Sequence, residues 1–177
     1  MRVIAGIYGG RELVAPRGRA TRPTSDRVRE ALFSILGGEL AGGGVLDLFA
    51  GSGALGIEAL SRGAAWATLV DSAPAAVEAI RRNLEALGIE AEVVRGPALR
   101  FLEAARRDAR QYDLVFLDPP YRHATALGRE LTSALRPILA ADARVVAESD
   151  RRSPLRLELP PLDERRYGDT LIQIYAS

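Results

Sequence analysis

The stretch Asp113-Leu-Val-Phe-Leu-Asp-Pro-Pro-Tyr121 is an apolar run that stops on an acid, two prolines and an aromatic ring. Residues 114–117 are apolar without alternation, which is typical of a strand buried on both faces of a parallel sheet. Two consecutive prolines cannot continue a central strand, so the sequence predicts a stiff loop after residue 117. This loop offers a carboxylate, backbone carbonyls and a flat ring. Such a set suits a substrate with an amino group and an aromatic face, although a plain strand-ending turn would look the same.

Strand and helix patterns alternate on both sides of this stretch. Strands are predicted at residues 45–50, 66–70, 91–94, 114–117, 144–147, 155–159 and 170–175. Helices are predicted at residues 53–61, 74–87, 98–107 and 125–139, where Pro137 can interrupt the last one. Strands separated by helices of this length favour right-handed crossovers. The expected fold class is α/β, with a doubly wound, seven-stranded and mostly parallel sheet.

Residues 1–44 read as a small N-terminal extension, and residues 45–177 as the core domain. The extension is predicted to hold a β-hairpin, from runs 3–8 and 12–15, then a basic loop and a helix whose cap is Thr24, Ser25 or Asp26. Residues 1–30 contain seven arginines and three acids. A basic segment of this kind indicates either a polyanion partner or a solvated arm.

The composition excludes several classes of site. The chain of 177 residues has no cysteine and one histidine, so neither a disulfide framework nor a thiolate or multi-histidine metal site is expected. No uncharged run is long enough to span a membrane or to act as a convincing signal peptide. We therefore expect a cytoplasmic protein that uses no metal and binds no membrane.

A glycine-rich turn follows the strand predicted at residues 45–50. Gly51, Gly53 and Gly56 have the G-x-G-x-x-G spacing, which brings backbone N–H groups and a helix start close to a ligand. This spacing alone is a weak signal, since tight packing also uses glycine. Asp71 ends the next strand 20 residues after Gly51, where a carboxylate can accept both ribose hydroxyls of an adenosine. The sequence therefore predicts a cofactor that carries a nucleoside.

Asp47 lies inside an otherwise apolar strand, where an unsatisfied charge is costly. One interpretation is that Asp47 only fastens the glycine loop. The other is that it faces the cofactor. An acid beneath a diphosphate would be electrostatically poor, whereas the sulfonium and ammonium groups of S-adenosylmethionine favour it. We expect S-adenosylmethionine rather than a dinucleotide.

Ligands of doubly wound sheets bind at the carboxyl ends of the strands where the winding direction switches. If the strands that end at Asp47 and before Asp118 flank that point, a methyl donor lies beside an amino-group clamp. In this hypothesis an exocyclic amine donates to Asp118 and to a carbonyl near Pro119, which turns its lone pair toward the methyl group. Asp118 is expected to be ionised near neutrality, with a reference pKa of ~3.9. Tyr121 is expected to stack on the base.

Several longer motifs carry a resemblance. Asp118-Pro-Pro-Tyr121 and Asp47-Leu-Phe-Ala-Gly-Ser-Gly53 resemble class I S-adenosylmethionine-dependent amino methyltransferases. Arg22-Pro-Thr-Ser-Asp-Arg-Val-Arg-Glu-Ala-Leu-Phe33, the run from Gly51 to Arg62 and the start Met1-Arg-Val-Ile-Ala-Gly6 resemble the RsmD family of bacterial 16S rRNA guanine-N2 methyltransferases. The resemblance covers essentially the whole chain.

The resemblance implies methylation of the 2-amino group of one guanine in 16S rRNA within a 30S subunit or an assembly intermediate, with S-adenosylhomocysteine as the product and no DNA partner. The implied catalytic residues are Asp118, Pro119, Pro120 and Tyr121. The implied cofactor-binding residues are Asp47, Ala50, Gly51, Ser52, Gly53, Asp71, Ser72 and Ala98. The implied RNA contacts are Arg17, Arg19, Arg22, Thr24, Arg27 and Arg29. Pro97 departs from the family pattern because it cannot donate to adenine, which leaves the N–H of Ala98.

Three alternatives compete with this interpretation. Another amino methyltransferase could act on adenine in nucleic acid or on protein glutamine, although glutamine enzymes generally have Asn in place of Asp118. A nicotinamide-dependent oxidoreductase would share Gly51, Gly53, Gly56 and Asp71, but it has no use for the motif that starts at Asp118. An inactive RNA-binding module would keep the fold without needing the acids.

Overall fold

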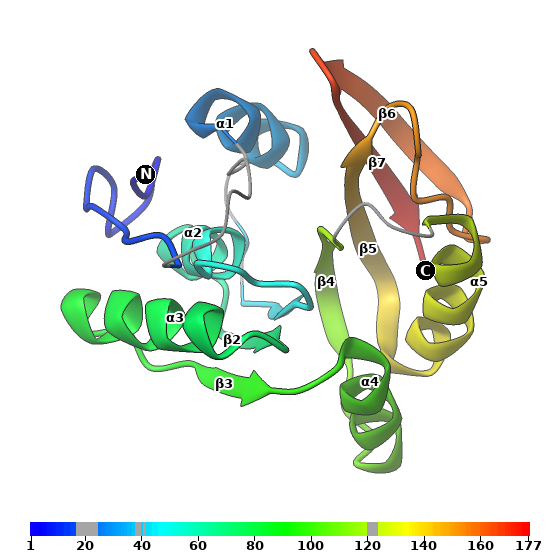
Figure 1. Cartoon of the computed structure of the whole chain (residues 1–177), viewed down its shortest axis with the longest axis horizontal. Helices are drawn as coiled ribbons and strands as arrows, with labels where there is room; N and C mark the ends of the chain where they lie inside the picture. The colour runs from blue at the N-terminus through cyan, green and yellow to red at the C-terminus, as the bar shows by residue number, and fades with distance from the viewer. Residues whose placement is uncertain (17–24, 38–39, 41, 120–123) are drawn as a thin grey trace.

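The computed structural model of the chain describes residues 1–16, 25–37, 40, 42–119 and 124–177 (Figure 1). Its elements in chain order are α1 (Asp26–Ile35), β1 (Gly44–Asp47), α2 (Ala54–Ser61), β2 (Trp66–Asp71), α3 (Pro74–Leu87), β3 (Glu92–Arg95), α4 (Ala98–Arg107), β4 (Tyr112–Leu117), α5 (Ala124–Leu135), a 3-10 turn (Arg136–Ile138), β5 (Leu139–Asp150), β6 (Pro161–Tyr167) and β7 (Thr170–Ala176). No helix within these ranges is long and apolar enough to cross a membrane.

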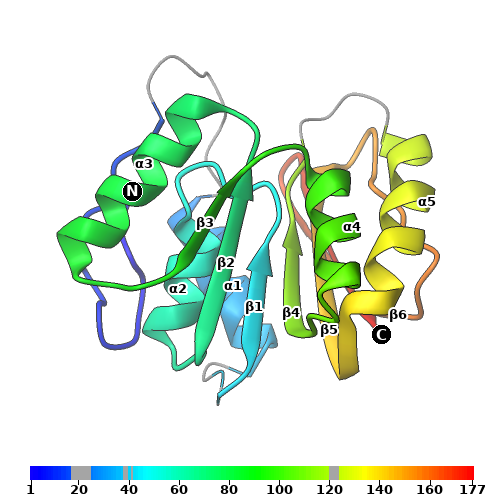
Figure 2. The same ribbon diagram turned by 90° about the horizontal axis from the view of Figure 1, so that it is seen from below.

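The strands form one seven-stranded sheet in the order β3-β2-β1-β4-β5-β7-β6. Strands β3, β2, β1, β4 and β5 are parallel, and β7 runs antiparallel between β5 and β6. Figure 2 follows the order from β2 through β1 to β4 and β5. The winding direction reverses between β1 and β4, as predicted, so a ligand crevice is expected at the carboxyl ends of these two strands.

Helices cover both faces of the sheet. Alternate residues of β1 show the division, since Val45 packs with α1, α2 and α3, whereas Leu46 packs with α4 and α5. Figure 1 shows the same separation, with α1, α2 and α3 on one side of the strands and α4 and α5 on the other. Burial on both faces explains why β1 and β4 have continuous apolar runs in place of an alternating pattern.

Helix α1 lies in the predicted N-terminal extension but packs within the main core. Its Leu32 and Phe33 are buried in the same cluster as residues of β1, β4 and β7. The rings of Phe33 and Phe116 are tilted with centroids 5.7 Å apart. The domain boundary predicted after residue 44 stays a prediction. In the structure, α1 and the sheet share one hydrophobic cluster.

The predicted N-terminal hairpin forms over a short length. Arg2 and Glu12 make an antiparallel bridge, and the N–H groups of Val3, Gly10 and Leu13 donate to the carbonyls of Arg11, Val3 and Met1, each at 2.9 Å. Neighbouring N–H groups bond to α2 instead. The amides of Ile4 and Ala5 donate to the carboxylate of Glu58 at 2.6 and 3.0 Å. The hairpin is therefore held against a helix by a buried acid, and its ladder stays short.

The strand predicted at residues 155–159 is wrong. Its leucines alternate and are buried, as a strand period requires. Its backbone, however, bonds to side chains: the N–H of Leu157 donates to the Tyr175 hydroxyl at 3.4 Å, and that of Glu158 donates to Thr132 Oγ1 at 3.0 Å. The segment is irregular and packs against α5, and β6 begins after it. We call residues 155–159 the strap.

Candidate active site

The glycine loop between β1 and α2 assigns a different task to each glycine. Gly51 has a φ of +56°, and a Cβ there would meet nothing within 4 Å, so its backbone borders open space. Gly53 has a φ of +79° and caps α2, and its Cβ would lie 2.9 Å from Leu69 Cδ2. Gly56 meets the same methyl group at 3.0 Å. Gly51 therefore opens the loop to a ligand, whereas Gly53 and Gly56 let α2 lie close to β2.

Asp71 joins this loop to the end of β2. Its Oδ2 accepts a hydrogen bond from the N–H of Gly51 at 2.9 Å, and its Oδ1 accepts from that of Ala73 at 2.8 Å. A carboxylate offers about four acceptor positions, so two bonds leave room for hydroxyl donors. Asp71, which is predicted to bind the ribose, thus also fixes the shape of the glycine loop. Ser72 beside it is exposed.

Asp47 is buried at the end of β1 and accepts from the N–H of Gly56 at 3.0 Å. The loop-fastening interpretation is therefore part of its role. Burial raises the pKa of Asp47 from 3.8 to about 7, while the Gly56 hydrogen bond lowers it and the charge of Asp71 raises it. A carboxylate in this position is stabilised by any cation that reaches it.

Asp118 follows β4 directly, and Pro119 after it is buried. The pKa of Asp118 lies well above its usual 3.8, first because of burial and then because of the charges of Glu148 and Asp47. The expectation of an ordinary pKa for Asp118 is therefore wrong. The three acids act on one another because their strands are neighbours, with Asp47 paired to Phe116 of β4 and residue 117 paired to residue 147 of β5.

Glu148 was missed in the sequence prediction. It is buried near the end of β5, one residue beyond the strand predicted at 144–147. The available signal was an acid at the end of an apolar run, which is the same signal that identified Asp47. Because β4 and β5 are parallel and adjacent, Glu148 and Asp118 come to the same edge of the sheet.

The other predicted cofactor residues differ in how their polar groups are used. Ser52 is buried, its Oγ donates to the sulfur of Met1 at 3.6 Å, and its carbonyl accepts from Asn83 at 2.9 Å. Ala50 is buried beside the loop, and its N–H donates to the carbonyl of Val70 at 3.0 Å. These groups are therefore already bonded within the chain, and the cofactor contacts of Ser52 and Ala50 stay a prediction.

Ala98 is the first residue of α4, where a backbone N–H has no partner within the helix. The N–H of Gly96 donates to the carbonyl of Asp71 at 3.1 Å, which brings the start of α4 beside the end of β2. Ala98, Asp71 and Gly51 thus come from three neighbouring segments at one edge of the sheet. This is the arrangement that a nucleoside spanning β1, β2 and β3 requires.

The predicted RNA-binding residues are only partly described. Arg17, Arg19, Arg22 and Thr24 lie outside the described residues, as do the predicted catalytic residues Pro120 and Tyr121. Arg27 is exposed on α1, and Ser25 caps that helix by accepting from the N–H of Val28 at 3.3 Å.

Arg29 is wrong as an RNA contact because its side chain is fully buried. Its Nη2 donates to the carbonyl of Arg2 at 2.5 Å and to Asp26 at 2.8 Å, and its Nη1 lies 3.9 Å from Glu58. Glu58 in turn accepts from Arg62 at 2.7 Å. Arg29 therefore joins the N-terminal segment, α1 and α2. Among the described residues, no group of three or more His, Cys, Asp or Glu is placed to hold a metal.

The family described as "Conserved hypothetical protein 95" matches residues 1–176 of the chain. The chain is 41% identical to "Putative rRNA methyltransferase YlbH" of Bacillus subtilis over 99% of this chain and 98% of that protein. It is 44% identical to "Ribosomal RNA small subunit methyltransferase D" of Escherichia coli K12 over 69% of this chain and 61% of that protein.

Solved structures agree with this match. The structure described as a putative methyltransferase, yhhF, from Escherichia coli has a TM-score of 0.84 and 36% identity, with 99% of this chain and 97% of that chain covered. The Thermus thermophilus 16S rRNA N2 G1207 methyltransferase RsmC, solved with AdoMet and guanosine, has a TM-score of 0.72 over 91% of this chain and 44% of that chain. At 21% identity, this second likeness shows the fold alone. The chain belongs to the conserved hypothetical protein 95 family, the RsmD family of methyltransferases.

Proposed function

We propose that the protein transfers a methyl group from S-adenosylmethionine to the exocyclic N2 amine of a guanine in 16S rRNA. The observation that carries this proposal is the position of Asp118, a half-buried carboxylate at the end of β4, on the strand next to the one that ends at Asp47 beneath the glycine loop. An acceptor for an amine and an acid for a cationic donor thus lie together at the switch point of the sheet. The names of the relatives from Bacillus subtilis and Escherichia coli support an rRNA substrate.

The residues present fit S-adenosylmethionine. Gly51 borders open space, Asp71 retains acceptor positions for ribose, and Ala98 begins α4 at the same edge of the sheet, where its N–H is proposed to bind adenine. Asp47 provides negative charge for the methionine end, and Asp118 adds to it. When bound, the cofactor supplies a methyl group on a positively charged sulfur. The methyltransferase family match decides against the nicotinamide-dependent oxidoreductase.

The chain itself acts by orientation and charge. An amine that donates to Asp118 Oδ and to the carbonyl of Pro119 is held with its lone pair away from both acceptors, toward the glycine loop. The raised pKa of Asp118 makes its carboxylate a better proton acceptor than an exposed aspartate, so Asp118 is suited to take the proton that the nitrogen gives up. Pro120 and Tyr121 remain predictions as the rest of the clamp, with Tyr121 stacking on the base.

We place the target guanine in a 30S subunit or an assembly intermediate, which implies the cytoplasm. Arg17, Arg19, Arg22 and Arg27 are proposed to contact phosphates, with an affinity that falls as salt rises.

The proposal is tested by methyl transfer from radiolabelled S-adenosylmethionine to naked 16S rRNA, to 30S particles from unmethylated cells and to DNA, followed by nucleoside mass analysis. We expect label in N2-methylguanosine from the rRNA or the particle. Label in methyladenine alone, or in a protein glutamine, would refute the guanine assignment. Donor binding with no transfer to any acceptor would favour an inactive RNA-binding module.

A further inference from the structure

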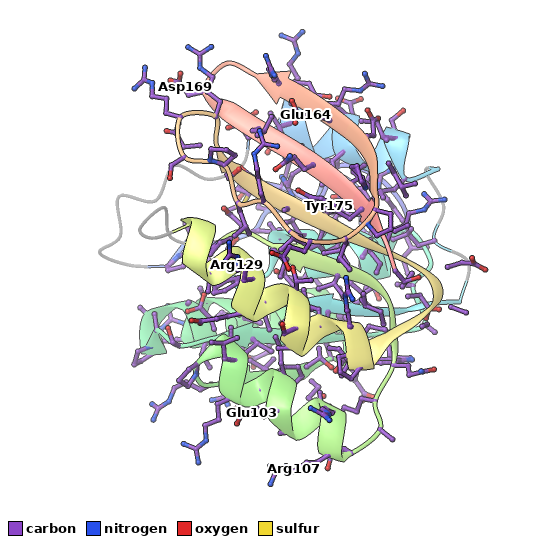
Figure 3. All side chains as sticks on the ribbon, turned by 90° about the vertical axis from the view of Figure 1, so that its right-hand side faces the viewer. Glu103, Arg107, Arg129, Glu164, Asp169 and Tyr175 are labelled. Carbon is purple, nitrogen blue, oxygen red and sulfur yellow. The ribbon has the colours of Figure 1, made fainter. Side chains whose placement is uncertain are left out.

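A groove of about 340 Å³ lies where β5, β6 and β7 end or begin. Its lining contains four arginines, Arg151, Arg152, Arg156 and Arg166, and one acid, Glu164. Pro154 and Leu171 complete the lining. Figure 3 shows this end of the β6 and β7 hairpin at Asp169, where several nitrogen-tipped side chains project outward. We call the surface formed by Arg151, Arg152, Arg156 and Arg166 the arginine groove.

The arginine groove lies on the same edge of the sheet as Asp118. Strand β5 is parallel to β4, and Ala147 is paired with Leu117 at the end of β4. Strand β5 then continues to Asp150, which places its end about 10 Å beyond that of β4 at ~3.3 Å per residue. An RNA chain with one nucleotide at Asp118 would therefore extend past the groove within a few nucleotides.

The arginines of the groove are accessible, and within the described residues only Arg166 of the four has a close acid, Glu164 at 3.0 Å. The side chains of Arg152 and Arg166 are 75% and 72% exposed. Asp169 is shared between Arg151 at 3.6 Å and Arg152 at 3.9 Å, both longer than a good hydrogen bond. Arg156 takes part in none of the ion pairs within the described ranges. Exposed ion pairs of this length are weak, so a stronger acceptor can displace them.

We propose that the arginine groove binds the sugar–phosphate backbone of rRNA next to the target nucleotide. This inference rests on the proposed function and adds an RNA contact on the β5–β7 side of the site, away from the N-terminal arginines. Guanidinium groups match phosphate because their planar N–H donors bind two oxygens at once. A concave surface with four cations and one acid fits a polyanion chain better than it fits a small neutral ligand.

The test is direct binding of purified full-length protein to naked 16S rRNA without methyl donor, measured by filter binding between 50 and 400 mM salt, chosen as roughly the range over which phosphate contacts weaken. The variant Arg152→Ala/Arg166→Ala removes two cations of the groove. We expect its Kd to rise roughly 20-fold at 0.1 M salt, and the slope of log Kd against log salt to fall by about 1.4.

The matched control is Arg106→Ala/Arg107→Ala, which removes two exposed cations from the end of α4. Figure 3 shows Arg107 at the opposite end of the molecule from Asp169. We expect the control to bind as wild type does. The variant Asp169→Asn removes an acid that competes for Arg151 and Arg152, so its Kd should fall. A purely structural role for these residues would not produce opposite signs.

The groove proposal is overturned if wild type does not bind rRNA, if the groove variant binds as tightly as wild type, or if the control weakens binding equally. Binding of polyglutamate but not of rRNA would assign the groove to an acidic protein and would also overturn it. Methyl transfer is measured separately. Groove-dependent RNA binding without any transfer would refute the proposed function and leave the groove proposal standing.

Discussion

The substitution Asp47→Asn should stabilise the ligand-free protein relative to wild type, and this gain should grow as the pH rises. The pKa of the Asp47 carboxyl is about 7 in the folded chain, against an ordinary value of 3.8. Between these values the folded chain keeps a proton that the unfolded chain has lost, so the free energy of unfolding falls as the pH rises through this window. The difference of about three units between the two pKa values lowers the free energy of unfolding by about 4 kcal/mol above pH 7.

Asparagine removes this cost without removing the contact. Its amide oxygen can still accept from the N–H of Gly56, but a neutral acceptor is weaker by about 1 kcal/mol. The net gain is therefore about 3 kcal/mol at pH 8, or roughly 6–12 °C in Tm for a chain of this size. Near pH 4, where the wild-type carboxyl is protonated, the gain should disappear.

The assay is urea unfolding of wild type and Asp47→Asn from pH 4 to pH 8. The matched control is Asp113→Asn, since the exposed carboxylate of Asp113 also accepts a backbone N–H, from Gly44 at 2.7 Å. The control removes the same charge without the burial and should give no comparable gain. A difference between wild type and Asp47→Asn that does not change with pH would refute the reasoning. The same variant should bind S-adenosylmethionine more weakly, which calorimetry measures.

Three further substitutions separate catalysis from packing. Asp118→Ala should lower single-turnover methyl transfer by about 10²–10³-fold with donor affinity largely kept in calorimetry, and unchanged turnover would remove Asp118 from the mechanism. Gly53→Ala should lower the free energy of unfolding by about 1–3 kcal/mol more than Gly88→Ala, because both have positive φ but only the first Cβ would contact β2; equal losses in urea titrations would contradict this. Arg29→Met should cost about 2–4 kcal/mol of unfolding free energy, whereas Arg27→Met on the exposed face should cost almost nothing. If the two arginine variants unfold alike, the buried role of Arg29 is refuted.

Much of the fold could be predicted because its signals are local. Helix α3 has the predicted bounds, since Pro74 starts it and Gly88 ends it with a φ of +65°. The unbroken apolar runs of β1 and β4 identified two central parallel strands, and their order followed from topology. The glycine loop and Asp71 were found because their spacing reflects one connection of fixed geometry.

The errors arise where a local pattern has a distant partner. A buried arginine and an exposed one read alike in sequence, and Arg29 is in contact with the carbonyl of Arg2 and with Glu58 on another helix as well as with Asp26 on its own. The strap at residues 155–159 has a strand period, but its N–H groups bond to Thr132 and Tyr175. Glu148 was missed because its meaning depends on the adjacency of β4 and β5, which appears only once the sheet is assembled.

The position of β7 has a consequence for synthesis and for truncation. It follows the other described strands in sequence, yet it lies between β5 and β6 and pairs with both. While a ribosome is still extending the chain short of residue 170, β5 has an unpaired edge on that side, and Ile172 and Ile174 are missing from the core. An open edge of this kind invites pairing with other chains. The sheet is therefore completed only once residues 170–176 have been translated, and truncations before residue 170 should aggregate.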